Sequence, residues 1–262
     1  MTGAATAARR ALLVGGLPLA LLALWWVASA GSQSFYLPPL RDILQTFVSV
    51  WLGPRLVEDV LPSLARLLAG FALATVLGVG LGVAVGSSPR LRAACEPVLE
   101  FLRAIPPPVL VPIFILVAGI GTSMKVLVIV SGCIWPILLN TVEGVRGRDE
   151  LLEDTCRVYG IGGAARLRHL VLRAASPQIV TGMRQALSIG IILMVISEMF
   201  AASSGLGFTI IQFQRGFAIP EMWSGILLLG LLGVALSLLF RVFERQVLSW
   251  YYGLRDAQRG PA

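Results

Sequence analysis

Residues 61–86 read LPSLARLLAGFALATVLGVGLGVAVG, a run in which Arg66 is the single charged side chain. A helix needs about 20 apolar residues to cross the hydrocarbon core of a bilayer, so this run predicts a membrane-spanning helix. Small residues recur every four positions from Gly70 to Gly86. Such a face lets another helix backbone approach closely. We expect it to pack within the chain, and a seam between two chains is the alternative.

The rest of the chain has the same character. Of its 262 residues, 56% are hydrophobic and 13% are charged, with a mean hydropathy of +0.84. Soluble domains are about 25% charged, so a soluble protein is excluded. The sequence predicts an all-α membrane protein of about six transmembrane helices, in one domain over 11–250 with its core at about 60–245. The further predicted spans are 11–30, 104–122, 124–143, 177–200 and 223–243, and a short surface helix is expected over 38–53.

The first predicted span has two interpretations. Ala28-Ser29-Ala30 resembles a signal-peptidase cleavage site. However, the apolar run 11–30 is longer than the 7–15 residues typical of a signal peptide. Trp25 and Trp26 also suit the aromatic belt at a membrane interface. We therefore expect a retained helix.

The cations indicate an orientation. With the N-terminus inside, the cytoplasmic segments hold fifteen arginines, whereas the outer segments hold only Arg41, Arg55, Lys125 and Arg215. This bias follows the positive-inside rule, so both termini, the tails 1–10 and 251–262, are predicted to be cytoplasmic in a bacterial inner membrane. No polar domain gathers the cations, which argues against nucleic-acid binding. The two remaining arginines, at 66 and 184, are expected to snorkel to the headgroups.

No motif for catalysis, metal or cofactor binding is present in the sequence. The stretch 119–125 has glycines like a phosphate loop but lacks its Gly-Lys-Ser/Thr ending. Cys95, Cys133 and Cys156 are widely separated, and His169 is the only histidine, whereas zinc sites usually use three or four N/S ligands. We therefore expect no cofactor and no enzymatic activity in this chain.

The connection 144–176 is longer than a hairpin between two spans requires. Acidic residues, Asp149 among them, begin a first helix, and glycines between 160 and 163 break it. A second, amphipathic helix is expected over about 164–172, with Leu167, Leu170 and Val171 on one face. From physics alone this segment is either a docking element for a soluble partner or a solvated loop on the lipid headgroups.

This loop resembles that of permeases from binding-protein-dependent ABC importers. Their pattern is Glu-Ala-Ala, three residues, Gly, nine residues, then Ile-x-Leu-Pro. Here Asp154-Thr155-Cys156, Gly160 and Leu170-Val171-Leu172-Arg173 stand at the same spacing. The chain departs from the pattern in Thr-Cys for Ala-Ala and in Arg173 for the final proline.

Other landmarks resemble the nitrate, sulfonate and taurine permeases, in order from about residue 36 to 250. The landmarks are Pro62-Ser63-Leu64-Ala65-Arg66, Ile105-Pro106-Pro107, Pro177–Arg184, Ser197-Glu198-Met199, Ser204-Gly205-Leu206-Gly207 and Glu244–Trp250. The resemblance implies a type I ABC importer permease fold, MetI-like, with a second and usually identical permease chain. It also implies separate ATPase subunits and an extracytoplasmic solute-binding protein.

The resemblance assigns a site as well. The loop 144–176 would couple to the ATPase through Asp154, Thr155, Cys156, Gly160, Arg166, Leu170 and Leu172. Candidate pathway-lining residues are Asn140, Ser188, Ser197 and Glu198, although the sequence favours a packing or hairpin role for each. The expected solute is a small anion such as a sulfonate, taurine or nitrate. A secondary transporter or channel, or a non-transporting membrane scaffold, are the alternatives; the first would need ionisable groups along its path.

Overall fold

The computed structural model describes residues 2–200 and 202–258, with side chains for 15–200 and 202–253. In these ranges all regular structure is helical, as predicted. The α-helices are α1 Thr2–Ser29, α2 Leu40–Trp51, α3 Leu61–Ser87, α4 Pro89–Ala104, α5 Val111–Ala118, α6 Thr122–Arg146, α7 Glu150–Val158, α8 Gly163–Arg166, α9 Leu172–Phe200, α10 Leu206–Arg215, α11 Ile219–Val247 and α12 Ser249–Gln258. Three shorter helical segments are η1 Leu56–Val60, η2 Pro107–Leu110 and η3 Leu167–Val171.

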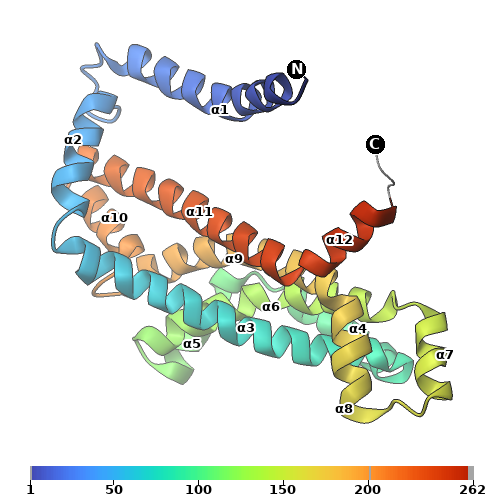
Figure 1. Ribbon diagram of the computed structural model, residues 1–262. Coiled ribbons are helices and arrows are strands. Elements are labelled where there is room, and N and C mark those ends of the chain that lie inside the picture. The colour runs from blue at the N-terminus through green and yellow to red at the C-terminus, as the bar shows by residue number, and fades with distance from the viewer. Residues whose placement is uncertain (1, 201, 259–262) are drawn as a thin grey trace.

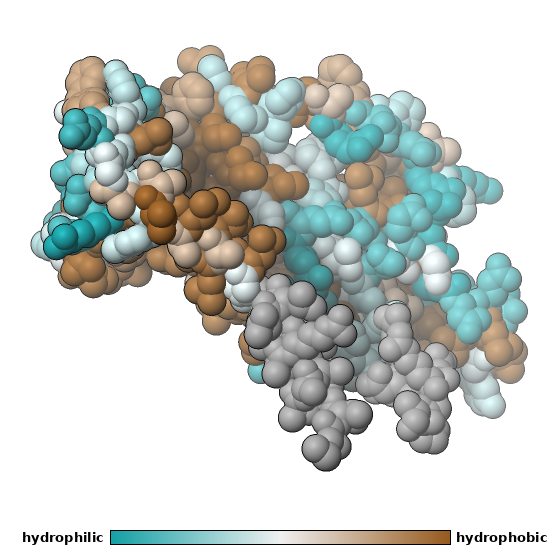
Figure 2. Space-filling view, turned by 90° about the horizontal axis from the view of Figure 1, so that it is seen from above, coloured by the Kyte–Doolittle hydropathy of each residue, from teal (hydrophilic) through white to brown (hydrophobic). Residues whose placement is uncertain are grey.

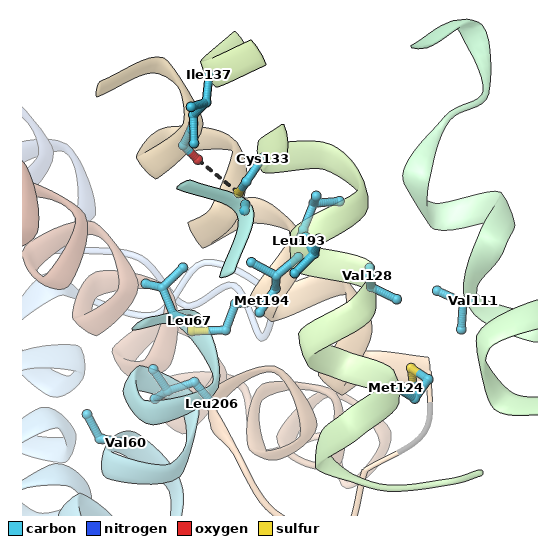
Figure 3. Packing of buried hydrophobic residues seen from close by; sticks show 14 of the residues in the cluster. Val60, Leu67, Val111, Met124, Val128, Cys133, Ile137, Leu193, Met194 and Leu206 are labelled. Carbon is cyan, nitrogen blue, oxygen red and sulfur yellow. Dashed lines mark hydrogen bonds between the residues drawn. The ribbon is translucent and has the colours of Figure 1, made fainter. Parts of the chain in front are cut away.

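Three long helices, α3, α6 and α9, form the core of the molecule (Figure 1). Figure 3 shows Leu67 of α3, Val128 of α6 and Met194 of α9 pointing into one shared apolar cluster, and each is fully or almost fully buried. The Sγ atom of Cys133 contacts the carbonyl oxygen of Ala186 at 3.2 Å across the α6–α9 interface. The spans predicted over 61–86, 124–143 and 177–200 therefore provide the packed centre of the fold.

The small-residue face of α3 lies against α6. A Cβ atom added at Gly82 would stand 2.5 Å from Cβ of Thr141, and one at Gly78 would stand 2.9 Å from Cγ2 of Ile137. These approaches are closer than a side chain permits, so glycine is what lets the two helices touch. The expectation that this face packs within the chain is confirmed.

Four helical stretches are long and apolar enough to cross a bilayer within the described residues. They are Leu56–Ser87, Thr122–Arg146, Gly163–Phe200 and Ile219–Val247. The predicted span 11–30 lies in α1, whose apolar part with described side chains is the shorter stretch Gly15–Ser29. The predicted all-α membrane fold is thus confirmed, and the spans over 61–86, 124–143, 177–200 and 223–243 each fall inside one long helix.

The predicted span 104–122 has a different form. Helix α4 ends at Ala104, and the next helical stretch, Pro107–Ala118, is bent from it by 85°. Prolines at 106 to 108 cause the break, because each lacks an N–H donor and disfavours helical backbone in the residue before it. Ile105 accordingly is extended, with φ −77° and ψ 118°. The two arms form a bent pair that is a broken span or a re-entrant loop.

The surface helix expected over 38–53 is α2, which packs against α11. The indole Nε1 of Trp51 donates to Oγ of Ser224 at 2.9 Å, and both residues are buried. In Figure 1, α2 and α10 stand at one end of the bundle, while α7, α8 and α12 stand at the other. Figure 2 shows apolar surface between these ends and hydrophilic side chains gathered towards both of them. This distribution is what a bilayer-spanning molecule requires.

Candidate functional site

The loop between α6 and α9 turns at Gly160. Its N–H donates to the carbonyl of Arg157 at 3.2 Å. The N–H of Ile161 donates to the carbonyl of Cys156 at 2.8 Å. These two bonds around a left-handed residue form a Schellman motif at the end of α7. Gly160 has φ of +67°, a region in which a residue with a side chain costs about 1–2 kcal/mol. The predicted break is confirmed, and this geometry explains the glycine.

Helix α7 begins with an N-cap, because Oδ1 of Asp149 accepts a hydrogen bond from the N–H of Leu151 at 2.9 Å. Acidic side chains in the first turn favour the positive end of the helix dipole. One of them, Glu153, forms ion pairs with Arg148, at 3.5 Å, and with Arg166. The carboxylate of Glu153 therefore ties the first arm of the loop to the second.

The first arm exposes large apolar side chains beside its charged ones, and α7 has no buried residue. Val158 and Tyr159 are 82% and 76% exposed, and Leu151 and Ile161 are also exposed. Exposed apolar side chains that adjoin one another mark an interaction surface more often than a solvated one. The loop therefore has the shape of a docking element.

The second arm differs from the predicted separate helix over 164–172. Helix α8, the π-helical η3 and α9 run on as one helical stretch, Gly163–Phe200. No helix-breaking residue stands between them, because the chain has Arg173 where the permease pattern has proline. Leu170 and Val171 are buried, the latter against Val145 of α6. The second arm is thus continuous with a membrane-spanning helix, although Figure 1 shows α8 turned away from the line of α9.

The residues expected to couple to a partner divide into two groups. Asp154 is exposed and forms an ion pair with Arg157 at 3.0 Å, and the hydroxyl of Thr155 donates to the carbonyl of Leu151 at 2.7 Å. Cys156 and Arg166 are half-buried, and Gly160 is exposed at the turn. By contrast, Leu170 is buried and Leu172 is half-buried, so these two anchor the arm to the bundle.

A buried ionic cluster lies at the opposite end of α9. The carboxylate of Glu198, which has no exposed surface, accepts from Nη1 of Arg66 at 2.6 Å. The hydroxyl of Ser63 lies 2.8 Å from both of its oxygens. The N–H of Gly207 donates to Oε2 at 3.0 Å. Helices α3, α9 and α10 are therefore joined through one carboxylate.

The segment before α10 wraps closely around this carboxylate. The N–H of Gly205 donates to Oδ1 of Asp59 at 3.0 Å, and the N–H of Leu206 donates to Oγ of Ser63 at 2.9 Å. A Cβ atom at Gly205 would stand 2.5 Å from the carboxyl carbon of Glu198. A residue with a side chain would not fit there without displacing the carboxylate.

This cluster corrects two expectations. Arg66 is only 7% exposed and binds Glu198 and the carbonyl of Ser204, so it does not snorkel to the headgroups. Glu198 and its neighbour Ser197 are fully buried within the chain, so neither faces an open path in this structure. We did not predict this pair from the sequence; the available signal was that ionisable residues within predicted spans usually pair with one another.

The other two candidate lining residues occupy more open positions. Asn140 on α6 is half-buried, and Ser188 on α9 is exposed. Arg184, also expected to snorkel, has a side chain that is 56% exposed and that forms an ion pair with Glu244 of α11. Tyr252 of α12 donates to the same carboxylate at 3.1 Å. This second ion pair links α9 to the last helices.

Comparisons with a family model and with individual proteins agree on the kind of protein this chain resembles. Residues 74–249 match the family model described as "Binding-protein-dependent transport system inner membrane component". The chain is 30% identical to a putative aliphatic sulfonates transport permease protein of Bacillus subtilis, over 89% of this chain and 86% of that protein. It is 27% identical to the taurine transport system permease protein of Escherichia coli, over 88% and 86%. It is 28% identical to the nitrate import permease protein of Synechocystis, over 87% and 86%.

The fold is also similar to that of a solved structure. It is described as an inward-facing conformation of the MetNI methionine ABC transporter. The TM-score is 0.63 at 22% identity, covering 76% of this chain and 97% of that chain. The predicted MetI-like permease fold is confirmed.

Proposed function

The chain belongs to the family of inner-membrane components of binding-protein-dependent transport systems, and on that basis we propose that it is the permease subunit of an ABC importer for a small anion. It forms the solute path across the membrane and couples that path to ATP hydrolysis on a separate chain. The observation that carries this proposal is the α7–α8 loop. It offers an exposed apolar surface on one side and continues directly into the spanning helix α9 on the other.

The geometry of the loop suits force transfer from a soluble ATPase. Ion pairs from Glu153 to Arg148 and Arg166 hold its two arms together. A partner that binds Val158 and Tyr159 therefore moves both arms, and with them the end of α9. We assign the ATPase contact to Asp154, Thr155, Cys156, Gly160 and Arg166, with Leu170 and Leu172 as the anchor.

The substrate class is inferred from the relatives. Proteins named for aliphatic sulfonates, taurine and nitrate match this chain over most of its length. These solutes are small molecules or ions that carry an oxyanion group. A small organic or inorganic anion is accordingly the proposed substrate.

The proposed assembly is a homodimer of this chain with two ATPase subunits and an extracytoplasmic solute-binding protein. The fifteen-to-four division of the cations supports cytoplasmic termini and a cytoplasmic α7–α8 loop. Helices α7 and α12 lie at the same end of the bundle in Figure 1, which agrees with this orientation.

The test is uptake into membrane vesicles from cells that make the transporter, with labelled taurine, ethanesulfonate and nitrate as probes. We expect uptake of one of these probes to require ATP and to continue after a protonophore collapses the proton gradient. Uptake that needs the gradient and not ATP would assign the chain to the secondary transporters instead. Purification of this chain should also recover an ATPase; a chain that is recovered alone after mild solubilisation would contradict the coupling role.

A further inference from the structure

Helix α9 presents a polar face that the fold leaves open. Gln178, Thr181, Gln185 and Ser188 follow one another at intervals of three or four residues, and all four are exposed. Residues three and four apart share one face of a helix. The same stretch, Gly163–Phe200, is apolar enough to cross a membrane. Because lipid tails offer no hydrogen-bond partners, this face does not belong against lipid.

The centre of the face is a pair of side-chain amides. Nδ2 of Asn140, on α6, donates to the carbonyl of Pro136 at 2.8 Å and to Oε1 of Gln185 at 3.4 Å. The acceptor end of Gln185 is thereby occupied. Its Nε2 has no hydrogen-bond partner within the described part of the chain. The Asn140 contact therefore turns the donor end of Gln185 towards the open side.

The neighbouring groups are also suited to an anion. The hydroxyl of Ser188, one turn along, has no partner among the described side chains either, and it can donate. Residues 163–197 contain no Asp or Glu. The nearest cation on the helix, Arg184, is 56% exposed in its side chain while it pairs with Glu244. Free hydrogen-bond donors with no carboxylate within 163–197 define a surface that can accept oxygen atoms bearing negative charge, since the one carboxylate of α9, Glu198, is buried against Arg66.

We propose that the face formed by Thr181, Gln185 and Ser188 lines a water-filled path, and that the Gln185 amide and the Ser188 hydroxyl donate hydrogen bonds to the oxygens of a passing oxyanion. This inference rests on the importer function and assigns Gln185, positioned by Asn140, as a specificity-determining residue. Uncharged donors suit this role, because a transport site has to bind its solute weakly enough to release it.

The test uses charged thiol reagents on the full chain in the membranes of cells that make it. The background variant carries Cys95→Ser and Cys156→Ser and keeps the buried Cys133. Into it are placed Gln185→Cys, Ser188→Cys and a matched control, Leu231→Cys, at an exposed apolar position of α11. The probes are anionic sulfonatoethyl methanethiosulfonate and its cationic trimethylammonium counterpart. A thiolate has to form in water for either reagent to react.

We expect the thiols at 185 and 188 to react and the thiol at 231 to remain unmodified. We also expect the anionic reagent to react severalfold faster than the cationic one at 185 and 188, relative to their rates with a free thiol in solution. Absence of reaction at 185 and 188 would mean that a dry interface covers the face, and equal or cation-favouring rates would refute oxyanion recognition. Both results overturn the proposal.

These measurements need neither ATP nor a transported solute. If the thiols react as expected but vesicles show no ATP-driven uptake, the importer assignment fails while the aqueous, anion-favouring face stands. If uptake is ATP-driven but the thiols do not react, the importer stands and the path lies elsewhere.

Discussion

Two arginine–carboxylate pairs stand in opposite regions of this molecule. Arg66 and Glu198 meet at 2.6 Å inside the bundle, where their side chains are 8% and 0% exposed. Arg157 and Asp154 meet at 3.0 Å on the α7 surface, where they are 76% and 65% exposed. The chemical groups are the same, yet a buried pair is costly to break and a surface pair contributes little.

The difference indicates which parts of the fold hold their shape and which depend on a partner. The buried end is held by side chains from α3, α9 and the segment before α10, so its geometry is determined within the chain. The first arm of the loop is held by backbone turns and by ion pairs at its surface, and its apolar side chains Val158 and Tyr159 are exposed. Substitutions in the two regions should therefore affect different measurements.

The largest expected effect comes from Glu198→Ala. It leaves the Arg66 guanidinium buried without its carboxylate, which costs about 3–5 kcal/mol when a buried pair is broken. Thermal unfolding in detergent, followed by the remaining monodisperse fraction, should show a large loss of stability. The double variant Arg66→Leu with Glu198→Leu should recover most of it, because neither member of the pair is then left as an unpaired buried charge. A double variant as unstable as the single one would show that the pair is not the source of the effect.

The next effect tests the close helix approach in the buried α3–α6 interface. Gly82→Ala places a Cβ atom 2.5 Å from Cβ of Thr141, and overpacking of this kind costs about 1–3 kcal/mol. Gly80→Ala, on the same helix, meets no atom within 4 Å and should be neutral or slightly stabilising, since alanine favours helix by up to about 1 kcal/mol. Equal unfolding midpoints for the two variants would contradict the α3–α6 seam.

At the loop, we expect a small effect on stability and a large effect on transport. Gly160→Val strains a left-handed residue by about 1–2 kcal/mol, so the Schellman turn should open while the bundle stays intact. ATP-driven uptake should be lost and the unfolding midpoint should hardly move. Gly162→Ala is the control, since Gly162 has φ of −128° and open space at its Cβ position. If the Gly160→Val variant binds its ATPase and takes up solute at the wild-type rate, the turn is not required for transport.

The smallest effect completes the comparison of ion pairs. Asp154→Asn removes the surface partner of Arg157 and should change stability by less than about 1 kcal/mol. That change should vanish at high salt, because exposed charges are screened. A stability loss comparable to that of Glu198→Ala would refute the distinction drawn between the two regions.

Apolar runs and glycine spacing predicted the four long spanning helices, those over 61–86, 124–143, 177–200 and 223–243, because both signals are local. The break at Gly160 was equally local. The bend at Ile105 follows from the prolines at 106–108, which are visible in the sequence. We nevertheless predicted one span over 104–122, because that stretch is apolar. The continuity of α8 with α9 was missed because an amphipathic pattern alone does not distinguish a separate helix from the extension of a longer one.

The Glu198 cluster was beyond local reasoning. Arg66 and Glu198 are 132 residues apart, and each position alone suited an interfacial side chain. Only the packing of α3 against α9 brings them together and buries them. Ser188 and Asn140, in contrast, could be proposed as lining residues because polar side chains in an apolar span are visible without tertiary contacts.

The helical backbone continues from Gly163 to Phe200, and this continuity has a mechanical consequence. Figure 1 shows that the stretch is not straight, because its start at α8 turns away from the line of α9. The wide π-helical turn at Leu167–Val171 and the proline at 177 both interrupt its regular α-helical hydrogen bonding. A displacement of the α8 end is therefore divided between bending at these two places and movement of α9, whose far end lies two residues beyond Glu198.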